Sequence, residues 1–224
     1  MQQTPAHTLY NPALLKAMPP SRSLVEVGCS TGALAAAYRR LHPNCNYTGI
    51  EIDANYAEIA RNNCNKVFVG DIEELLKHQS HLINLRADGY VFGDCLEHLY
   101  DPWCVLKILK GLIPKTGWIC ACIPNMQYYG VQAKLNRGEI FYEDNGPLDR
   151  THIRWFTKKT ITHLFESSGF TIEYIRPIHV PNKQDELGVK LAANMAKFQG
   201  RDPQQAAIDA LAFQYVLRAR PIDN

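Results

Sequence analysis

Five short apolar runs alternate with helix-like segments in the first 125 residues, and this alternation constrains the fold more than any other feature. Such runs are typical of buried strands, whereas the segments between them carry the three- and four-residue spacing of helices. Strands that alternate with helices pair in parallel through right-handed crossovers, with helices on both faces of the sheet. The sequence therefore predicts a doubly wound α/β fold. The predicted strands are 23–27, 47–52, 66–69, 87–92 and 118–123.

The pattern continues less regularly after the fifth strand. The predicted helices of the first part are 31–41, 54–62 with Asp53 as N-cap, 71–78 and 102–112. Beyond them we expect a polar segment at 136–150, a helix at 158–168, a strand at 171–178, a helical region at 184–211 and a last strand at 214–219.

Composition narrows the class of protein without naming a partner. A chain of 224 residues with 46% hydrophobic content can bury one sizeable core, so we expect a single domain. A net charge of +2, spread along the chain, gives no strong field for nucleic acid or a membrane surface. The N-terminus lacks a basic and then apolar leader, and no run is long enough for a membrane span. We expect a soluble, cytoplasmic protein.

Seven cysteines are scattered through apolar segments without a CxxC pair, which is typical of reduced, buried thiols. Cys120 and Cys122 would share one face of a strand, where they could bind a metal or form a disulfide. Buried free cysteine is far more often a small core residue, so we favour core packing. The sequence indicates no metal site.

The turn after the first strand carries the first chemical signal, in the string VEVGCSTG from Val25 to Gly32. Glycine lets the backbone take unusual dihedrals and lets a ligand approach the main chain. The dinucleotide pattern G-x-G-x-x-G is not met, because Ser30 and Ala33 occupy its second and third glycine positions. A nucleotide-type ligand other than a dinucleotide is indicated.

Three acids at strand ends narrow the ligand. Glu26 suits a cationic group better than a pyrophosphate, and Glu51 is placed to accept hydrogen bonds from both ribose hydroxyls. Asp71 follows the third strand, where it can meet an adenine amine or cap the next helix, and the two roles are compatible. An adenosine with a cationic sulfonium and an amino-acid tail fits all three acids.

With these residues in place, the chain resembles class I S-adenosylmethionine-dependent methyltransferases. VEVGCSTG is similar to the first motif of that family, GIEID to the second, VGDI to the third and YVFGDCLEHL to the fourth. The fourth has the form seen in small-molecule methyltransferases of the ubiquinone-biosynthesis type. DRTHIRWFT, from Asp149 to Thr157, and the helix after it resemble a branch that methylates cell-surface sugars and secondary metabolites. The resemblance covers roughly residues 10 to 180.

The resemblance implies a Rossmann-like, seven-stranded sheet, mostly parallel, with an antiparallel last strand inserted beside the fifth. It implies S-adenosylmethionine as cofactor and S-adenosylhomocysteine as product. Residues 1–20 would be a helical lead-in, 21–125 the cofactor-binding core, and 126–224 the acceptor side with the last strands. The cofactor-binding residues that it implies are Glu26, Gly28, Cys29, Ser30, Gly32, Glu51, Ile52, Asp71, Ile72, Gly93, Asp94 and Leu96.

Methyl transfer to a hydroxyl needs alignment of donor and acceptor and removal of one proton, for which histidine is suited. His98 follows the fourth strand at the edge where open α/β sheets bind ligands. His152 lies in the segment where the family builds its acceptor pocket, as does Asp149. We predict His152, His98 and Asp149 as catalytic residues. For His152 the alternative is that it only braces the loop.

The sequence favours O-methylation of a small molecule or glycan precursor, although it does not identify the acceptor or the oligomeric state. The fourth motif reads GDCL rather than the Pro-Pro form of base methyltransferases, and no nucleic-acid-binding patch is evident. Two other interpretations stay open: a non-catalytic, cofactor-binding subunit of a complex, and a nicotinamide-dependent oxidoreductase. A cluster of aromatic residues would either wall the acceptor pocket or cover a sheet edge. Its members are Tyr128, Tyr129, Phe141, Tyr142, Trp155 and Phe156.

Overall fold

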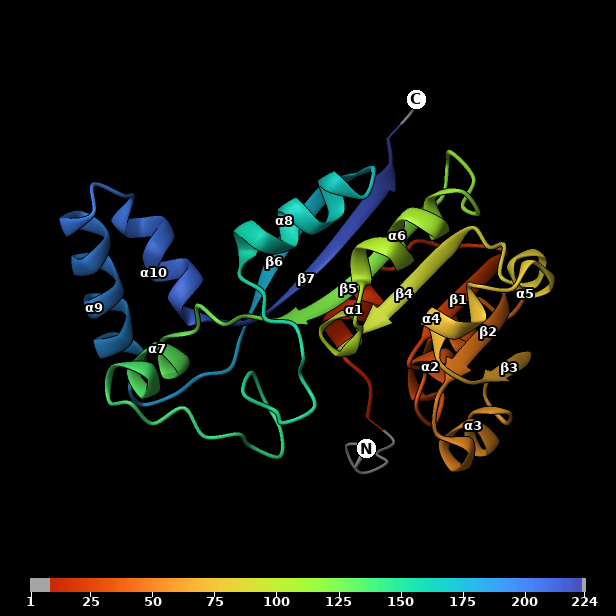
Figure 1. Ribbon diagram of the computed structural model, residues 1–224, viewed down its shortest axis with the longest axis horizontal. Helices are drawn as coiled ribbons and strands as arrows, with labels where there is room; N and C mark the ends of the chain where they lie inside the picture. The colour runs from red at the N-terminus through yellow and green to blue at the C-terminus, as the bar shows by residue number, and fades with distance from the viewer. Residues whose placement is uncertain (1–8, 223–224) are drawn as a thin grey trace.

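The computed structural model describes residues 9–222 and contains one seven-stranded sheet flanked by helices (Figure 1). Its strand order is β3-β2-β1-β4-β5-β7-β6. The first five strands pair in parallel, and β7 pairs antiparallel with both β5 and β6. The predicted Rossmann-like sheet, with its antiparallel last strand beside the fifth, is therefore confirmed. The strands are β1 (Ser23–Val27), β2 (Asn46–Glu51), β3 (Lys66–Val69), β4 (Gly89–Gly93), β5 (Trp118–Pro124), β6 (Phe170–His179) and β7 (Ala212–Pro221).

Several helices begin at a short polar side chain that caps them. Asp53 accepts hydrogen bonds from the first turn of α3, as predicted, and Thr157 forms a capping box with Thr160 at the start of α8. The helices are α1 (Pro12–Ala17), α2 (Ala33–Leu41), α3 (Ala54–Ala60), α4 (Ile72–Leu75), α5 (Gln79–Asn84), α6 (Pro102–Lys110), α7 (Tyr129–Asn136), α8 (Lys158–Ser167), α9 (Asp185–Phe198) and α10 (Pro203–Leu211), with the 3-10 turn η1 (Leu96–His98).

Two helices were not predicted, and one predicted helical region is divided. The short helices α5 and α7 lie in stretches whose apolar spacing is weak. The region 184–211 splits into α9 and α10 because Gly200, with φ of 65°, ends the first helix. Asp202 then caps the second helix, and Pro203 occupies its first turn.

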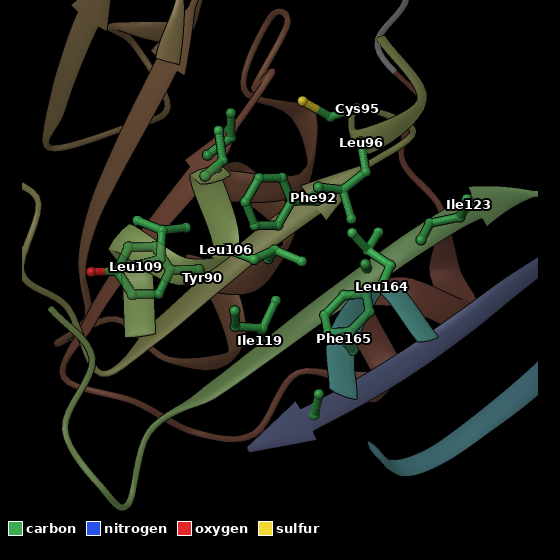
Figure 2. Close-up of a cluster of buried hydrophobic side chains, with 14 of the residues drawn as sticks. Tyr90, Phe92, Cys95, Leu96, Leu106, Leu109, Ile119, Ile123, Leu164 and Phe165 are labelled. Atoms are coloured by element: carbon green, nitrogen blue, oxygen red, sulfur yellow. The ribbon is translucent and has the colours of Figure 1, made fainter. Parts of the chain in front are cut away.

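The core lies on both faces of the sheet. Successive side chains of β5 point to opposite faces, so they pack alternately into two hydrophobic clusters. Ile119, Ala121 and Ile123 belong to the cluster that packs under α6 and α8, part of which Figure 2 shows with Phe92, Leu106 and Phe165. Cys120 and Cys122 face the other cluster and are fully buried. All seven cysteines are free, so the prediction of thiols packed in the core holds for these two.

The hairpin of α9 and α10 extends beyond the sheet (Figure 1), and α10 contacts β6 and β7 at its base. The two helices pack against each other, and α9 leaves a row of apolar side chains exposed. The row consists of Leu187, Leu191, Met195 and Phe198. Within residues 9–222 no helix combines the length and apolar character that crossing a membrane requires.

Asn125 joins the end of β5 to the start of β7. Its side-chain Nδ2 donates to the backbone carbonyls of Asp209 and Ala212, each at 2.8 Å, and its Oδ1 accepts from the backbone N–H of Gln127. The side chain is fully buried, so water cannot replace these bonds. This residue fixes where the inserted strand enters the sheet.

We predict that Asn125→Ala lowers the free energy of unfolding by about 2–4 kcal/mol, because it leaves two buried carbonyls and one N–H without partners. Urea unfolding followed by circular dichroism measures the change. Asn136→Ala is the matched control, since that exposed amide donates only to Gln132, and it should shift the value by less than about 0.5 kcal/mol. Equal losses in the two variants would show that Asn125 has no special place in the fold.

Candidate functional site

A cavity of about 680 Å³ opens at the carboxyl ends of β1, β2, β3 and β4. Ten of the twelve predicted cofactor-binding residues line it, together with all three predicted catalytic residues. The ten are Glu26, Gly28, Cys29, Ser30, Glu51, Ile52, Asp71, Ile72, Gly93 and Asp94. The predicted site residues in the cavity come from positions up to 126 apart in the chain, from Glu26 to His152.

Gly32 and Leu96 do not line this cavity in the described part of the chain. Gly32 begins α2 with φ of 75°, and a Cβ on it would lie 2.9 Å from the Cβ of Asn63. It therefore permits close packing of two segments rather than contact with a ligand. Leu96 is fully buried in the core beneath the site.

The turn between β1 and α2 is bonded to the end of β2. The backbone N–H groups of Gly28 and Cys29 both donate to the carbonyl of Ile50, at 2.9 and 3.0 Å. Ser30 replaces the middle glycine of the expected motif, yet it takes the left-handed conformation with φ of 48°. Since that region is uncommon for residues with a Cβ, the surrounding hydrogen bonds hold Ser30 in place. The serine therefore leaves the path of the turn intact.

Glu51 supplies one of those bonds. Its buried carboxylate accepts from the backbone N–H of Ser30 at 2.7 Å through Oε2, and from that of Asp53 at 2.9 Å through Oε1. Each carboxylate oxygen has a second acceptor position. Glu51 can therefore hold the turn and accept hydroxyl protons from a ligand at the same time.

Glu26 lies deeper in the cavity, at 4% exposure, and accepts a hydrogen bond from the Tyr47 hydroxyl at 3.0 Å. Burial raises the pKa of Glu26 well above its usual range, and the nearby Cys64 and Glu51 add to this effect. A ligand cation in the cavity would favour the ionised carboxylate.

Asp71 and Asp94 complete the acidic lining. Asp71 accepts a hydrogen bond from the backbone N–H of Glu73 at 2.8 Å. Asp71 is therefore the N-cap of α4, which is one of the two roles expected for it. Asp94 takes a left-handed conformation with φ of 53°, and its carboxylate accepts from the side-chain amide of Gln214 on β7. Gln214, which sequence reasoning missed, thus brings the inserted strand to the cavity.

The segment DRTHIRWFT is bonded along its backbone to the turn after β4. The carbonyl of Glu97 accepts from the N–H groups of Ile153 and Arg154, at 3.0 and 2.9 Å. Farther on, the carbonyl of Phe156 accepts from Met126 at 2.8 Å. These bonds set His152 beside η1.

His98 and His152 meet edge to face, with ring centroids 4.8 Å apart. Nδ1 of His98 lies 3.1 Å from the carbonyl of Thr151, and Nδ1 of His152 lies 3.3 Å from that of Pro147. Burial lowers the pKa of both rings, and for His152 the neighbouring His98 lowers it further. Both imidazoles are therefore held in the neutral form near pH 7.

Asp149 has a different role from the two histidines. Its Oδ1 accepts from the backbone N–H and the hydroxyl of Thr151, at 2.8 and 2.7 Å. Burial raises its pKa, but these hydrogen bonds and the two histidines outweigh burial and leave the pKa below its usual value. A carboxylate in this state is a weak base, and its hydrogen bonds brace the loop that carries His152.

Glu97 belongs to the site although sequence reasoning did not select it. It is 1% exposed and lies next to His98, and its Oε1 is 3.9 Å from Nε2 of His152. Its position directly before a predicted site histidine was the available signal. Burial of Glu97 follows from the docking of residues 149–157, which no local pattern shows.

Of the two alternatives for the aromatic cluster, the structure does not support a wall of the cavity. None of the six aromatic residues named from the sequence lines the cavity within residues 9–222: Tyr129 and Phe156 are buried in packing, while Phe141, Tyr142 and Trp155 are exposed. Tyr128 packs edge to face on Phe213. The aromatic residues that do line the cavity are Tyr10, Tyr56, Tyr100 and Phe213.

Solved structures of methyltransferases share this fold. A chain in the complex between the Haloferax volcanii Trm112 methyltransferase activator and the putative methyltransferase superposes with a TM-score of 0.61, at 13% identity, over 94% of this chain and 88% of that one. A possible histamine N-methyltransferase from Thermotoga maritima superposes with a TM-score of 0.60, at 17% identity, over 93% of this chain and 87% of that one. Human N-acetylserotonin methyltransferase in complex with S-adenosylmethionine superposes with a TM-score of 0.58, at 15% identity, over 94% of this chain and 51% of that one.

Sequence comparison identifies the family. No curated protein sequence matches the chain. The family model described as a methyltransferase domain matches residues 3–175, which is more than half of the chain. This match removes the basis for the nicotinamide alternative. The chain belongs to the class I methyltransferases, whose methyl donor is S-adenosylmethionine.

Proposed function

We propose that residues 1–224 act as one methyltransferase domain that transfers a methyl group from S-adenosylmethionine to a hydroxyl of a small molecule or glycan precursor. The observation that carries this proposal is the pair of imidazoles, His98 and His152, which meet edge to face in the lining of the cavity that Gly93 and Asp94 also line. A hydroxyl acceptor must lose a proton during transfer, and a neutral imidazole site serves that need.

The lining supports a definite placement of the donor. Glu26 faces the ammonium of the methionine portion, and the turn at Gly28 to Thr31 approaches its carboxylate. Glu51 accepts from the ribose hydroxyls, while Asp71 and Ile72 lie along the adenine. The sulfonium then lies near Gly93 and Asp94. A cavity of about 680 Å³ is in the range of small-molecule sites and has room for the donor and a modest acceptor.

The reaction is a direct displacement, so positioning supplies most of the catalysis. The acceptor oxygen forms a bond to the methyl carbon while the carbon–sulfur bond breaks and its electron pair stays on sulfur. In this proposal the hydroxyl proton is removed at the histidine pair, and Asp149 holds the loop that carries His152.

A second candidate is a non-catalytic, cofactor-binding subunit of a complex. The exposed apolar row on α9 is the observation that favours it, since such rows mark contact surfaces. The fold is also shared with a chain of the Trm112 complex. Cofactor binding without turnover over a broad panel of hydroxyl acceptors would favour this candidate over the first.

We predict that Glu26→Gln and Glu51→Gln weaken donor binding in distinguishable ways. Glu26→Gln should weaken S-adenosylmethionine about tenfold or more but leave 5′-methylthioadenosine unchanged, because that ligand lacks the ammonium. Glu51→Gln should weaken both ligands, because both carry the ribose hydroxyls. Isothermal titration calorimetry measures the four dissociation constants.

Glu58→Gln provides the matched control, since Glu58 is an exposed glutamate on α3 that pairs with Arg61. Its affinities should equal those of the wild type. Equal effects of Glu26→Gln on the two ligands would overturn the placement of the methionine portion.

We predict that His152→Ala lowers kcat at least a hundredfold and leaves the dissociation constant for S-adenosylmethionine within twofold, because the ring acts at the acceptor end. A panel of small-molecule hydroxyl acceptors, with S-adenosylhomocysteine release as the signal, supplies the substrate for this measurement. His163→Ala, which changes an exposed histidine of α8, should leave both values unchanged. Full turnover in His152→Ala would exclude His152 from the reaction.

A further inference from the structure

Three potential metal ligands meet at the acceptor end of the cavity. Glu97 and His98 come from η1 after β4, and His152 comes from the docked segment 149–157. One ligand atom from each of the three lies within 4.8 Å of the other two. Ligands about 2.0–2.2 Å from a cation lie roughly 3–3.6 Å apart, so small side-chain rotations would close this group on an ion.

The carboxylate of Glu97 is buried without the bonds that a buried charge needs. Neither of its oxygens has a hydrogen-bond partner among residues 9–222, and the side chain is 1% exposed. Nε2 of His152 lies 3.9 Å from Oε1 of Glu97, which is beyond hydrogen-bond range. Asp94 and Asp149 add negative charge nearby rather than balance it. A positive ion between Glu97 and the histidines would satisfy this carboxylate.

The two histidines are oriented as metal ligands are. A backbone carbonyl can only accept, so the contacts to Thr151 and Pro147 assign the proton of each ring to Nδ1. Each Nε2 then carries a free electron pair. Metal-bound histidines commonly donate their other ring N–H to a carbonyl in this way, which fixes the ring and makes the ligating nitrogen more basic.

We infer that Glu97, His98 and His152 bind a divalent transition-metal cation, with its remaining coordination positions open to the cavity. Two imidazoles and one carboxylate suit Zn²⁺, Mn²⁺, Co²⁺ or Fe²⁺ better than Mg²⁺ or Ca²⁺, which prefer oxygen ligands alone. The sequence indicated no such site because its ligands are separated by the 53 residues between His98 and His152.

This inference rests on the proposed function for its chemical meaning. A cation at this point binds the acceptor hydroxyl and lowers its pKa, so that the proton leaves to water in the open cavity. The resulting oxyanion then displaces the thioether, and the carbon–sulfur electron pair stays on sulfur. His98 and His152 serve in this account as ligands that position the acceptor, and the cation takes over the activation of the hydroxyl.

Cobalt binding tests the site without any methyl acceptor. The chelator-treated full chain, titrated with Co²⁺, should bind one equivalent and show visible d–d absorption. The dissociation constant should rise at least tenfold in Glu97→Gln and His152→Ala and stay unchanged in His163→Ala. Less than 0.1 equivalent bound at millimolar Co²⁺, or equal binding in all four proteins, overturns the inference.

Thermal unfolding distinguishes a variant that has lost the metal site from one that is poorly folded. Without metal, Glu97→Gln should melt within a few degrees of the wild-type temperature, because an amide of the same shape replaces a buried carboxyl group whose oxygens have no hydrogen-bond partner among residues 9–222. Zn²⁺ at a hundredfold excess over its dissociation constant should raise Tm of the wild type by about 5–10 °C and leave that of the variant unchanged. Equal Zn²⁺ shifts in both proteins would contradict the site.

The proposed O-methylation and the proposed cation site can each be rejected without the other. Metal binding without methyl transfer to any hydroxyl acceptor would keep the cation site and reject the proposed function. Turnover that requires His152 but persists in metal-free protein would keep O-methylation and reject the cation.

Discussion

The central strand β1 pairs in parallel with β2 on one side and β4 on the other, and the rest of the site depends on this arrangement. Strand order reverses at β1, so the loops that follow β1 and β4 leave in opposite directions and open a crevice between them. The turn at Gly28 closes one side of the crevice by bonding to Ile50, and the turn at Asp94 closes the other. The cavity is therefore a consequence of sheet topology before any side chain is considered.

A second backbone connection brings His98 and His152 together at that crevice. The carbonyl of Glu97 accepts from the N–H groups of Ile153 and Arg154, which ties the segment 149–157 to the turn after β4. Asn125 fixes the start of β7 from the end of β5, and Gln214 at that position reaches Asp94. The turns at Gly28 and Asp94, the segment 149–157 and β7 are thus parts of one hydrogen-bonded frame around the cavity.

Local chemistry was sufficient to predict much of the fold. Short apolar runs located β1 to β5, and a short polar side chain located the start of α3 at Asp53. The order of the last strands came from family resemblance, because pairing between β5 and β7 is a long-range property. The helix α7 escaped prediction because it combines Tyr129, Gly130 and Val131 in its first turn, and these residues have modest helix propensity.

The lining of the cavity was predictable where an acidic residue ends or follows a predicted strand, as for Glu26, Glu51 and Asp71. It was not predictable where burial decides the role. Glu97 is significant because its carboxylate lacks partners, and that fact follows from the docking of a segment more than fifty residues away. In the same way, Tyr10 and Phe213 line the cavity although they lie near opposite ends of the chain, and no local pattern selected them.

The central claim is that the methyl donor lies with its sulfur toward Glu97, His98 and His152. A crystal structure with S-adenosylhomocysteine tests this most directly. The account predicts the amino-acid tail at the Gly28 turn, the ribose at Glu51 and the sulfur between Asp94 and the histidine pair. A ligand that binds elsewhere, or whose sulfur faces away from the histidines, would contradict it.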